Sequence, residues 1–428
     1  MNLVFFSLVL FLMVIRMPIA FAIGMGSAIS MYLFFHVPLA VVVQNMFTSN
    51  DSFPLIAVPL FMLAGVLMES GGISRRLVNF ASSLVGFVYG GLAHVTILAS
   101  MFFAGISGAA AADTAAVGTL MIPEMKKRGY DPGFASAIQA AAGTIGVIIP
   151  PSIPMVILGV MASISIGGLF LGGVMSGILI GLSLMVLSYF IARRRKYHAK
   201  NRFALAQVWA TFKEALWALG MPLIIVGGIV SGIFTATECA VVAVDYALVV
   251  GFLVHKELKL KDLPGLLVRA SVTSALVMFI IANASVLGWV LAFQSIPQTV
   301  VQTFLSLSTN PIVLLLIINL LLLIVGCFIE TASALIIFVP LLTPLIPHLG
   351  IDPIQFGVMI VISLAIGMLT PPMGICLFVA CSIGQVTMEQ ISKAVLPFLL
   401  IMIVDLLLVC YVPFFTTFLP GLFMGHGP

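Results

Sequence analysis

Two carboxylates stand in segments that are otherwise too apolar to hold a charge. Asp113 follows the small residues Gly-Ile-Ser-Gly-Ala-Ala-Ala-Ala at 105–112, and Glu330 follows Gly-Cys-Phe-Ile at 326–329. A charged side chain at the centre of a bilayer costs about 2.5 to 3.5 kcal/mol on insertion scales, so it marks a functional site by default. Small residues also ease helix packing, which explains the glycines and alanines but not the carboxylates. We therefore predict ion or substrate handling for both residues, with capping of a half-helix as the alternative for Glu330.

A double proline follows each of these segments, at 150–151 and at 371–372. Proline has no N–H to donate to the carbonyl four residues earlier, so each pair frees two backbone oxygens. These oxygens belong to Gly146 and Val147 in the first half of the chain and to Gly367 and Met368 in the second. Broken helices in transporters present such carbonyls to sodium, and a kink that serves only shape is the alternative. The pairing in both halves favours two ion sites.

The elements that must position these residues lie in a membrane. Hydrophobic residues make up 62% of the 428 positions and charged residues 7%, which is far outside the range of soluble globular domains. We expect on the order of a dozen membrane segments, some too short or too broken to cross fully. The basic clusters at 75–76, 126–128, 193–202 and 256–261 are typical of cytoplasmic loops and give no sign of nucleic-acid binding. The stretch 1–15 is predicted to be a retained membrane segment, because it lacks a basic start and a cleavage site.

The two halves of the chain repeat each other. Residues 105–159 align without a gap to residues 326–380 at a constant offset of 221, and the matches are mostly Gly, Pro and Asp, which set backbone shape. Repeated shape in two halves is the usual mark of a transporter. Lys-Lys-Arg precedes the Gly129 turn, whereas the residues before the matching Gly350 turn carry no fixed positive charge. The turns should therefore lie on opposite sides of the membrane, which predicts inverted repeats with two re-entrant helical hairpins.

These features predict an all-α polytopic membrane protein with six parts. Residues 1–104 form N-terminal scaffold helices, 105–192 the first transport repeat, and 193–214 a cytoplasmic polar linker. Residues 215–325 form the scaffold helices of the second half, 326–393 the second transport repeat, and 394–428 a C-terminal membrane helix. Outside this scheme, Thr235 or Thr237 is expected to cap the helix that starts near Glu238, a structural role.

Four motifs resemble the large (M) subunit of tripartite ATP-independent periplasmic (TRAP) transporters. They are Gly-Ile-Ser-Gly-Ala-Ala-Ala-Ala-Asp at 105–113, Ile-Pro-Pro-Ser at 149–152, the Thr-Glu segment at 232–245 and Gly-Met-Leu-Thr-Pro-Pro-Met-Gly at 367–374. The resemblance covers essentially the whole chain. It implies a permease of the bacterial inner membrane that moves by an elevator mechanism and is coupled to two or more Na⁺ ions. It also implies two partners, a four-helix small membrane subunit (Q), expected here as a separate polypeptide, and a periplasmic substrate-binding protein (P).

The resemblance also implies site residues. One sodium site of the family falls here on Ser107, Gly146, Ile149 and Pro151, and the symmetric site falls on Phe328, Gly367, Thr370 and Pro372. For the substrate, a small organic anion, we expect contacts from Asp113, Thr114, Ser152, Ser165, Glu330 and Thr331. A sialic acid such as N-acetylneuraminate is the favoured anion on overall resemblance, and a C4-dicarboxylate is the other candidate.

Three other functions compete with this interpretation. An intramembrane enzyme would need a nucleophile and base or metal ligands, yet the six histidines are scattered and no HExxH or GxSxG motif appears, so we predict that the chain is not an enzyme. A purely structural membrane subunit, surrounded by lipid, would not need two carboxylates and two broken helices. A divalent-anion:sodium symporter that works without a binding protein stays open as the alternative.

Overall fold

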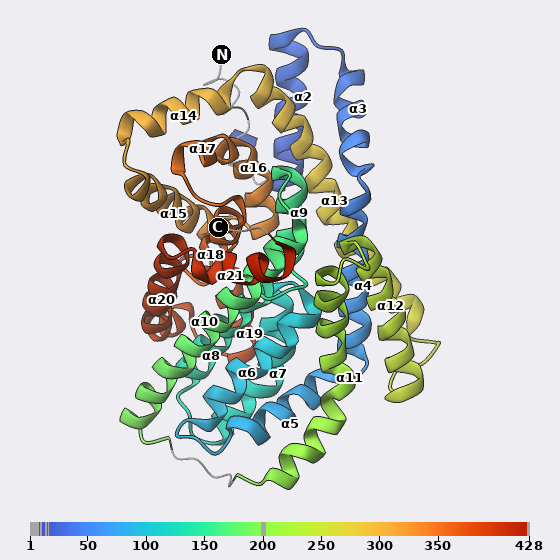
Figure 1. Ribbon diagram of the computed structural model, residues 1–428, viewed down its shortest axis with the longest axis vertical. Coiled ribbons are helices and arrows are strands. Elements are labelled where there is room, and N and C mark those ends of the chain that lie inside the picture. The colour runs from blue at the N-terminus through green and yellow to red at the C-terminus, as the bar shows by residue number, and fades with distance from the viewer. Residues whose placement is uncertain (1–7, 9–10, 13–14, 16, 198–202, 426–428) are drawn as a thin grey trace.

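The structure is a computed structural model that describes residues 17–197 and 203–425, together with 8, 11, 12 and 15. Every regular element in those residues is a helix (Figure 1). The prediction for the segment 1–15 lies almost wholly outside the described residues, and so does the centre of the polar linker, at 198–202.

Eight helical segments of the described chain are long and apolar enough to cross a membrane. They are Phe53–Ser70, Ile166–Arg194, Leu205–Val230, Ala236–Val254, Leu263–Phe293, Pro311–Phe328, Thr331–Leu349 and Met388–Tyr411. Shorter apolar helices of 10 to 17 residues accompany them, too short to span a bilayer on their own. The prediction of an all-α polytopic protein with full and broken membrane segments is confirmed.

The two halves contain the same sequence of elements. In the first, α6 (Gly91–Ser107) and α7 (Ala110–Lys127) form a hairpin, and α8 (Pro132–Gly143), the 3₁₀ turn η2 (Thr144–Val147) and α9 (Ile153–Ala162) form a broken helix. In the second, α15 (Pro311–Phe328) and α16 (Thr331–Leu342) form the hairpin, and α18 (Pro353–Gly367) and α19 (Ile375–Gly384) the broken helix. The long helices α10 (Ile166–Arg194) and α20 (Met388–Tyr411) follow.

Local chemistry is also shared between the repeats. The Asp131 carboxylate accepts from the N–H of Phe134 at 2.8 Å to cap α8, and Asp352 caps α18 through the N–H of Ile354 at 2.7 Å. Both repeats have a cis Pro-Pro peptide, at 150–151 and 371–372. The offset of 221 found in the sequence therefore matches the same backbone shape in both halves.

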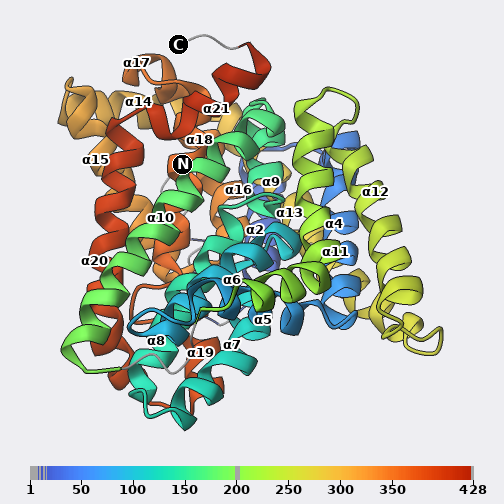
Figure 2. The same cartoon turned by 60° about the horizontal axis from the view of Figure 1, so that its bottom comes forward.

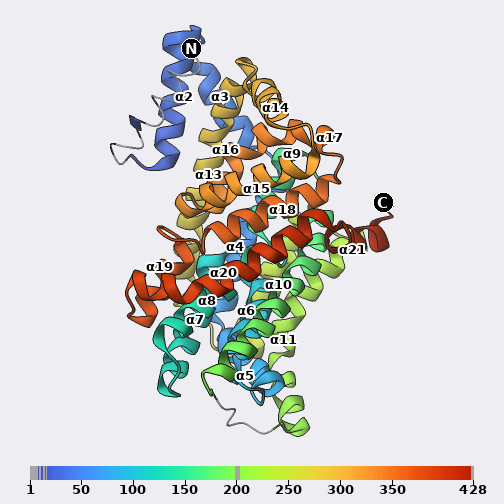
Figure 3. The same cartoon turned by 90° about the vertical axis from the view of Figure 1, so that its left-hand side faces the viewer.

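The repeats run in opposite directions. The connection between α7 and α8 and the short helix α17 (Ile346–Leu349), which leads into the Gly350 turn, lie at opposite ends of the molecule (Figures 2 and 3). Each hairpin packs beside the second part of the other repeat's broken helix, α7 against α19 and α16 against α9. At one of these contacts Lys126 Nζ donates to the Gly384 carbonyl at 2.8 Å. This is the arrangement of inverted repeats.

We predict that an impermeant thiol reagent labels Arg128→Cys and His348→Cys from opposite sides of the membrane, in a background without other cysteines. The Lys-Lys-Arg cluster holds the first turn in the cytoplasm, and the matched turn has no such anchor. Glu389→Cys, at the start of α20, serves as the control and should label from the same side as Arg128→Cys. Labelling of positions 128 and 348 from one side would rule out the predicted topology.

The remaining helices pack beside the repeats. They are α2 (Ile19–Phe35), α3 (Leu39–Asn50), η1 (Phe53–Ile56), α4 (Ala57–Ser70), α5 (Ile73–Val85), α11 (Leu205–Val230), α12 (Ala236–Val249) with its π-helical extension η3 (Val250–Val254), α13 (Leu263–Phe293), α14 (Ile296–Leu307) and α21 (Phe414–Met424). The short turn η4 (Thr343–Leu345) instead links α16 to α17 within the second repeat. Helices α12 and α13 pack on α4, and α2 and α3 pack on α13. In Figure 1 the helices α3, α4, α12 and α13 lie on one side of the molecule, whereas α15 and α20 lie on the other.

Two sequence predictions concern the starts of helices. Thr235 caps α12 in a capping box with Glu238, whose carboxylate accepts from the Thr235 N–H at 2.8 Å, and the structural role is confirmed. Thr237 instead donates to the Phe53 carbonyl at 2.9 Å. The domain boundaries stay predictions; those after residues 104 and 325 fall inside α6 and α15, the first helices of the two hairpins.

Candidate functional site

The tip of the first hairpin brings Ser107 and Asp113 into contact. Ser107 ends α6 and Asp113 lies in the first turn of α7, so the turn at Gly108 folds one onto the other. Ser107 Oγ donates to Asp113 Oδ1, and the N–H of Ala109 donates to Ser107 Oγ at 3.2 Å. Asp113 is completely buried, and its second oxygen, Oδ2, has no hydrogen-bond partner among the described residues. Since buried carboxylates need a partner, this orphaned oxygen fits a cation.

The break in the first repeat lies directly against this carboxylate. A Cβ added at Gly146 would lie 2.1 Å from Asp113 Oδ2, so only glycine leaves room for it. On the other side of the break, a Cβ added at Gly108 would lie 2.5 Å from the Pro151 carbonyl oxygen, and Gly108 has a positive φ of 66° that favours glycine. The hairpin tip and the helix break are therefore in direct contact, and the contact includes oxygen atoms of the kind that bind Na⁺.

The carbonyls freed by proline are only partly open. Ser152 Oγ donates to the Val147 carbonyl at 2.5 Å, and the carbonyls of Gly367 and Met368 accept from the N–H groups of Thr370 and Cys376 at 2.9 and 3.2 Å. Among the described residues no donor reaches the Gly146 carbonyl. The prediction that each break leaves two open carbonyls is therefore too simple, although a carbonyl with one hydrogen bond retains a second lone pair for a cation.

The second repeat has the same contact between hairpin and helix break, but different side chains surround it. Gly326 at the hairpin and Gly367 at the break touch, since a Cβ added at Gly367 would lie 2.5 Å from the Gly326 Cα. Thr370 Oγ1 donates to the Ile366 carbonyl at 2.8 Å, while Phe328 and Pro372 are exposed. Ala334 stands where the first repeat has Asp113, and Glu330 stands at the position of Ala109. The first predicted ion site is thus buried and acidic, whereas the second is open.

The residues predicted for the substrate come from both repeats and from the start of α10. Asp113, Thr114 and Ser152 are buried at the first hairpin and break, where the Thr114 hydroxyl donates to the Ala110 carbonyl at 2.8 Å. Thr331 is buried beside Met368 in the second repeat, and Glu330 is the exposed N-cap residue of α16. Ser165 caps α10 and lines another cavity, with Phe53 and Thr235. The remaining predicted ion-site residue, Ile149, lies within the first break and donates its N–H to the Ile145 carbonyl at 3.0 Å.

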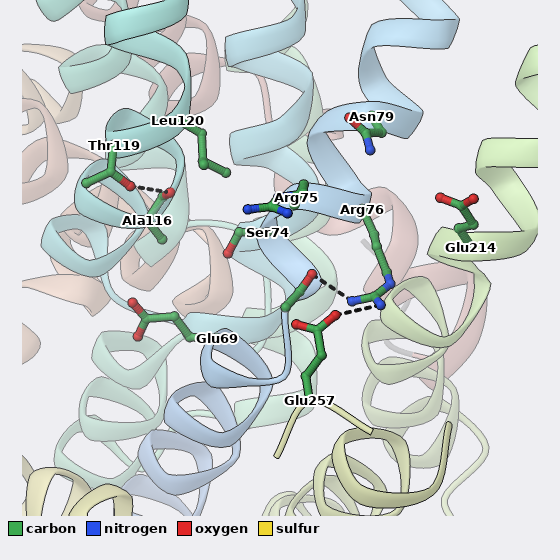
Figure 4. A pocket seen from close by; sticks show the side chains of 11 residues that line it. Glu69, Ser74, Arg75, Arg76, Asn79, Ala116, Thr119, Leu120, Glu214 and Glu257 are labelled. Atoms are coloured by element: carbon green, nitrogen blue, oxygen red, sulfur yellow. Dashed lines mark hydrogen bonds and ion pairs between the residues drawn. The ribbon is translucent and has the colours of Figure 1, made fainter. Parts of the chain in front are cut away.

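Two cavities lead away from the first hairpin tip. The smaller, of about 130 Å³, has Ser107 and Ala109 on one wall and residues of α4 and α13, among them Glu69 and Arg269, on the other. The larger, of about 450 Å³, is lined by Glu69, by Arg75 and Arg76 of α5, and by α7 (Figure 4). Because the first hairpin and the outer helices both line the smaller cavity, it marks the boundary between them.

Three charged residues of interest were not predicted from the sequence. Asp405, in the apolar helix α20, is buried and accepts a hydrogen bond from Ser183 of α10. Its position inside an apolar run was a usable signal, because intramembrane carboxylates are rare. Glu69 and Arg269 form an ion pair of 3.2 Å, but they lie at helix ends beside basic clusters, where charge is ordinary. Only their proximity in space sets them apart.

Comparison with known proteins fits this architecture. Residues 6–415 match the family model described as "Tripartite ATP-independent periplasmic transporter, DctM component". The isethionate TRAP transporter permease protein DctMQ of Oleidesulfovibrio alaskensis is 44% identical over 96% of this chain, which spans 65% of that relative. The sialic acid TRAP large permease SiaM of Vibrio cholerae is 44% identical over 90% of both chains, and the C4-dicarboxylate large permease DctM of Pseudomonas aeruginosa 39% over 94% of both.

A solved structure supports the fold alone. The YdaH transporter of Alcanivorax borkumensis superimposes with a TM-score of 0.57 over 90% of this chain and 88% of that chain, at 17% identity. The curated relatives are named as permeases and not as enzymes, which confirms the prediction that the chain is not an enzyme. With its family match and its many apolar helices, the chain belongs to the TRAP transporter family as a large permease subunit, a multi-pass protein of the bacterial inner membrane.

Proposed function

We propose that this permease imports a small organic anion in symport with two or more Na⁺ ions. The observation that carries the proposal is the buried Asp113 carboxylate, whose Oδ2 has no hydrogen-bond donor among the described residues and lies against Gly146. A bound Na⁺ would supply the missing positive charge. Ser107 holds the carboxylate through Oδ1, Gly146 lies against Asp113, and Asp113 is completely buried, so the site is shielded from bulk water.

The second ion would bind at the matching break, near Phe328, Gly367, Thr370 and Pro372. The support for this second site is weaker, because no negatively charged carboxylate occupies the position equivalent to Asp113. It is the more exposed of the two sites, so its ion would exchange more readily with the surroundings. Coupling then follows if the anion binds well only when both ions are in place.

Transport itself is proposed to follow an elevator mechanism, in which the inverted repeats move against the outer helices. The small cavity between Ser107 of the hairpin and Arg269 of α13 lies on that boundary. The cavity interrupts the packing between the repeats and the outer helices at this point, as expected of two surfaces that slide past each other.

Three further components complete the proposal. A four-helix small membrane subunit would pack on the outer helices, whose lipid-facing side chains include Leu223, Leu253 and Val268, each more than 60% exposed. A periplasmic binding protein would deliver the anion. N-acetylneuraminate remains the favoured substrate and a C4-dicarboxylate the other, while the isethionate-named relative adds a sulfonate to the anions that should be tested.

We predict that uptake into proteoliposomes requires an inward sodium gradient, the small subunit and the binding protein. Labelled N-acetylneuraminate, succinate and isethionate are each offered with sodium or with potassium. Uptake should rise more steeply than first order in sodium, and an interior negative potential should speed it, since each net charge gains about 2.3 kcal/mol per 100 mV. Full uptake in potassium would refute sodium coupling. Sodium-driven uptake without the binding protein would favour the divalent-anion symporter instead.

A further inference from the structure

Two cavities meet at Glu69, one beside the first hairpin tip and the other beside Arg75 and Arg76 of a basic cluster. Glu69, at the end of α4, lines both the 130 Å³ cavity beside Ser107 and the 450 Å³ cavity beside Arg75. The larger cavity opens among residues of α5 and the loop before α13, two regions predicted to be cytoplasmic from their charge. An anion that leaves the hairpin towards the cytoplasm would pass Glu69.

The charged residues that line these two cavities differ in how fully they are paired. Arg76 is held by Glu257 at 2.7 Å and by the Gly72 carbonyl at 2.9 Å, as Figure 4 shows. Arg269 is the one cation among the described residues that line the smaller cavity, and Glu69 is the one anion. They are joined by a single contact of 3.2 Å between Arg269 Nη2 and Glu69 Oε2. Arg269 is therefore the cation that shares a cavity with the hairpin tip.

That ion pair leaves most of the guanidinium unused. Arginine has five N–H donors in a planar fork, and the contact of Arg269 with Glu69 uses one of them. The Arg269 side chain is 61% exposed, and ion pairs at such exposed positions contribute little to stability. A carboxylate or sulfonate that offers two oxygens to the fork forms a stronger contact than Glu69 does, so it can displace Glu69.

We propose that Arg269 is an anion-binding residue of the cytoplasmic release route and that Glu69 competes with the transported anion for it. Arg269 takes the carboxylate or sulfonate as it leaves the hairpin. Glu69 then re-forms its ion pair with Arg269 and repels the anion towards the larger cavity. The site thereby returns to its starting state without a second ligand. This inference rests on the proposed import of an organic anion and adds the residue that recognises the anion's charge.

The competing explanation is structural, since the pair also joins α4 to α13. The two roles make different predictions for the two residues. If the pair only ties the helices together, Arg269→Gln and Glu69→Gln remove the same contact and should act alike. If Arg269 binds the anion, Arg269→Gln weakens anion binding from the cytoplasmic side, whereas Glu69→Gln removes the competitor and strengthens it.

The test is anion exchange in proteoliposomes that contain both membrane subunits, with the binding protein outside and equal sodium on both sides. Under these conditions exchange requires no sodium gradient. N-acetylneuraminate, succinate and isethionate are used in turn, and the quantity measured is the half-saturating concentration of the internal anion. Arg269→Gln should raise it about tenfold, the value expected for one lost charge-assisted contact. Glu69→Gln should lower it severalfold, and Arg269→Lys should fall between wild type and Arg269→Gln.

A matched control is the exposed ion pair between Arg128 and Glu124, which has a length of 2.9 Å and lies at the C-terminal end of α7. Arg128→Gln and Glu124→Gln should leave the internal half-saturation unchanged. The sodium half-saturation should also be unchanged in the Arg269 and Glu69 variants, because neither residue belongs to the predicted ion sites.

The outcomes separate the inference from the proposed function. Equal shifts in Arg269→Gln and Glu69→Gln, or no shift in either, would overturn the inference and leave sodium-coupled anion import intact. Absence of exchange of all three anions by the wild type would overturn both. If Arg269→Gln does not fold, the opposite directions expected for Glu69→Gln and Arg269→Lys still decide the question.

Discussion

Asp113→Asn is expected to abolish sodium-driven uptake while the protein remains folded and inserted. Asparagine has nearly the shape of aspartate and can still accept from Ser107, but it brings no negative charge to the orphaned position beside Gly146. A contact between opposite unit charges is worth roughly 4 kcal/mol at an effective dielectric constant of 20. Even half of that energy predicts that the half-saturating sodium concentration rises by about thirtyfold. The measurement is the sodium dependence of anion uptake in proteoliposomes.

Asp405→Asn provides the matched control for this experiment. Asp405 is also a buried carboxylate that accepts from a serine of a neighbouring helix, yet it lies on the unbroken helix α20. Its loss should leave the sodium half-saturation unchanged. Normal uptake by a well-expressed Asp113→Asn protein would show that the charge at position 113 is incidental, and an equal loss in both variants would point to a general effect on folding.

The fold could be predicted because its turning points are fixed by residues with narrow backbone preferences. Asp131-Pro132 and Asp352-Pro353 each start a helix, since aspartate caps and proline fits the first turn. The double prolines interrupt the helix that begins at each Asp-Pro pair. Gly108, with its positive φ, permits a hairpin turn that other residues disfavour. These signals depend on a few neighbouring residues, so they can be recognised even in a chain whose many apolar residues say little about where helices begin and end.

The site could be predicted only in part, because its contacts join residues far apart in the chain. The sequence predicts Asp113 as a substrate contact, whereas in the structure its Oδ1 accepts from Ser107 and its unpartnered Oδ2 lies against Gly146, both residues of the predicted ion site. The partners of the freed carbonyls, such as Ser152 for Val147, depend on how each break folds back on itself. Ser165, predicted as a substrate contact, caps α10 in the structure by accepting from the Gly168 N–H at 3.2 Å.

Gly146→Ala is expected to destabilise the protein and to stop transport. The first effect comes from a steric clash with Asp113, and the second from displacement of its carboxylate from the ion site. The added methyl group would lie 2.1 Å from Asp113 Oδ2 and 2.6 Å from Asp113 Cγ, so the carboxylate must move away from the break. Overpacking of this kind typically costs about 1–3 kcal/mol. Thermal unfolding of the purified protein measures this cost, and sodium-driven uptake measures the loss of the site.

The double variant Asp113→Ala/Gly146→Ala separates the clash from the loss of charge. Without the carboxylate, the nearest Asp113 atom to the new methyl group is Cβ at 3.2 Å, a tight but tolerable contact, so thermal stability should recover towards wild type while uptake stays absent. Gly227→Ala and Gly288→Ala are the controls, since both glycines are helical and an added Cβ would meet no atom within 4 Å. Alanine exceeds glycine in helix propensity by about 1 kcal/mol, so these controls should be as stable as wild type or more so. If Gly146→Ala is as stable as the controls, or if the double variant is no more stable than Gly146→Ala, then the carboxylate does not occupy the space beside the break, and the first ion site is not built around Asp113.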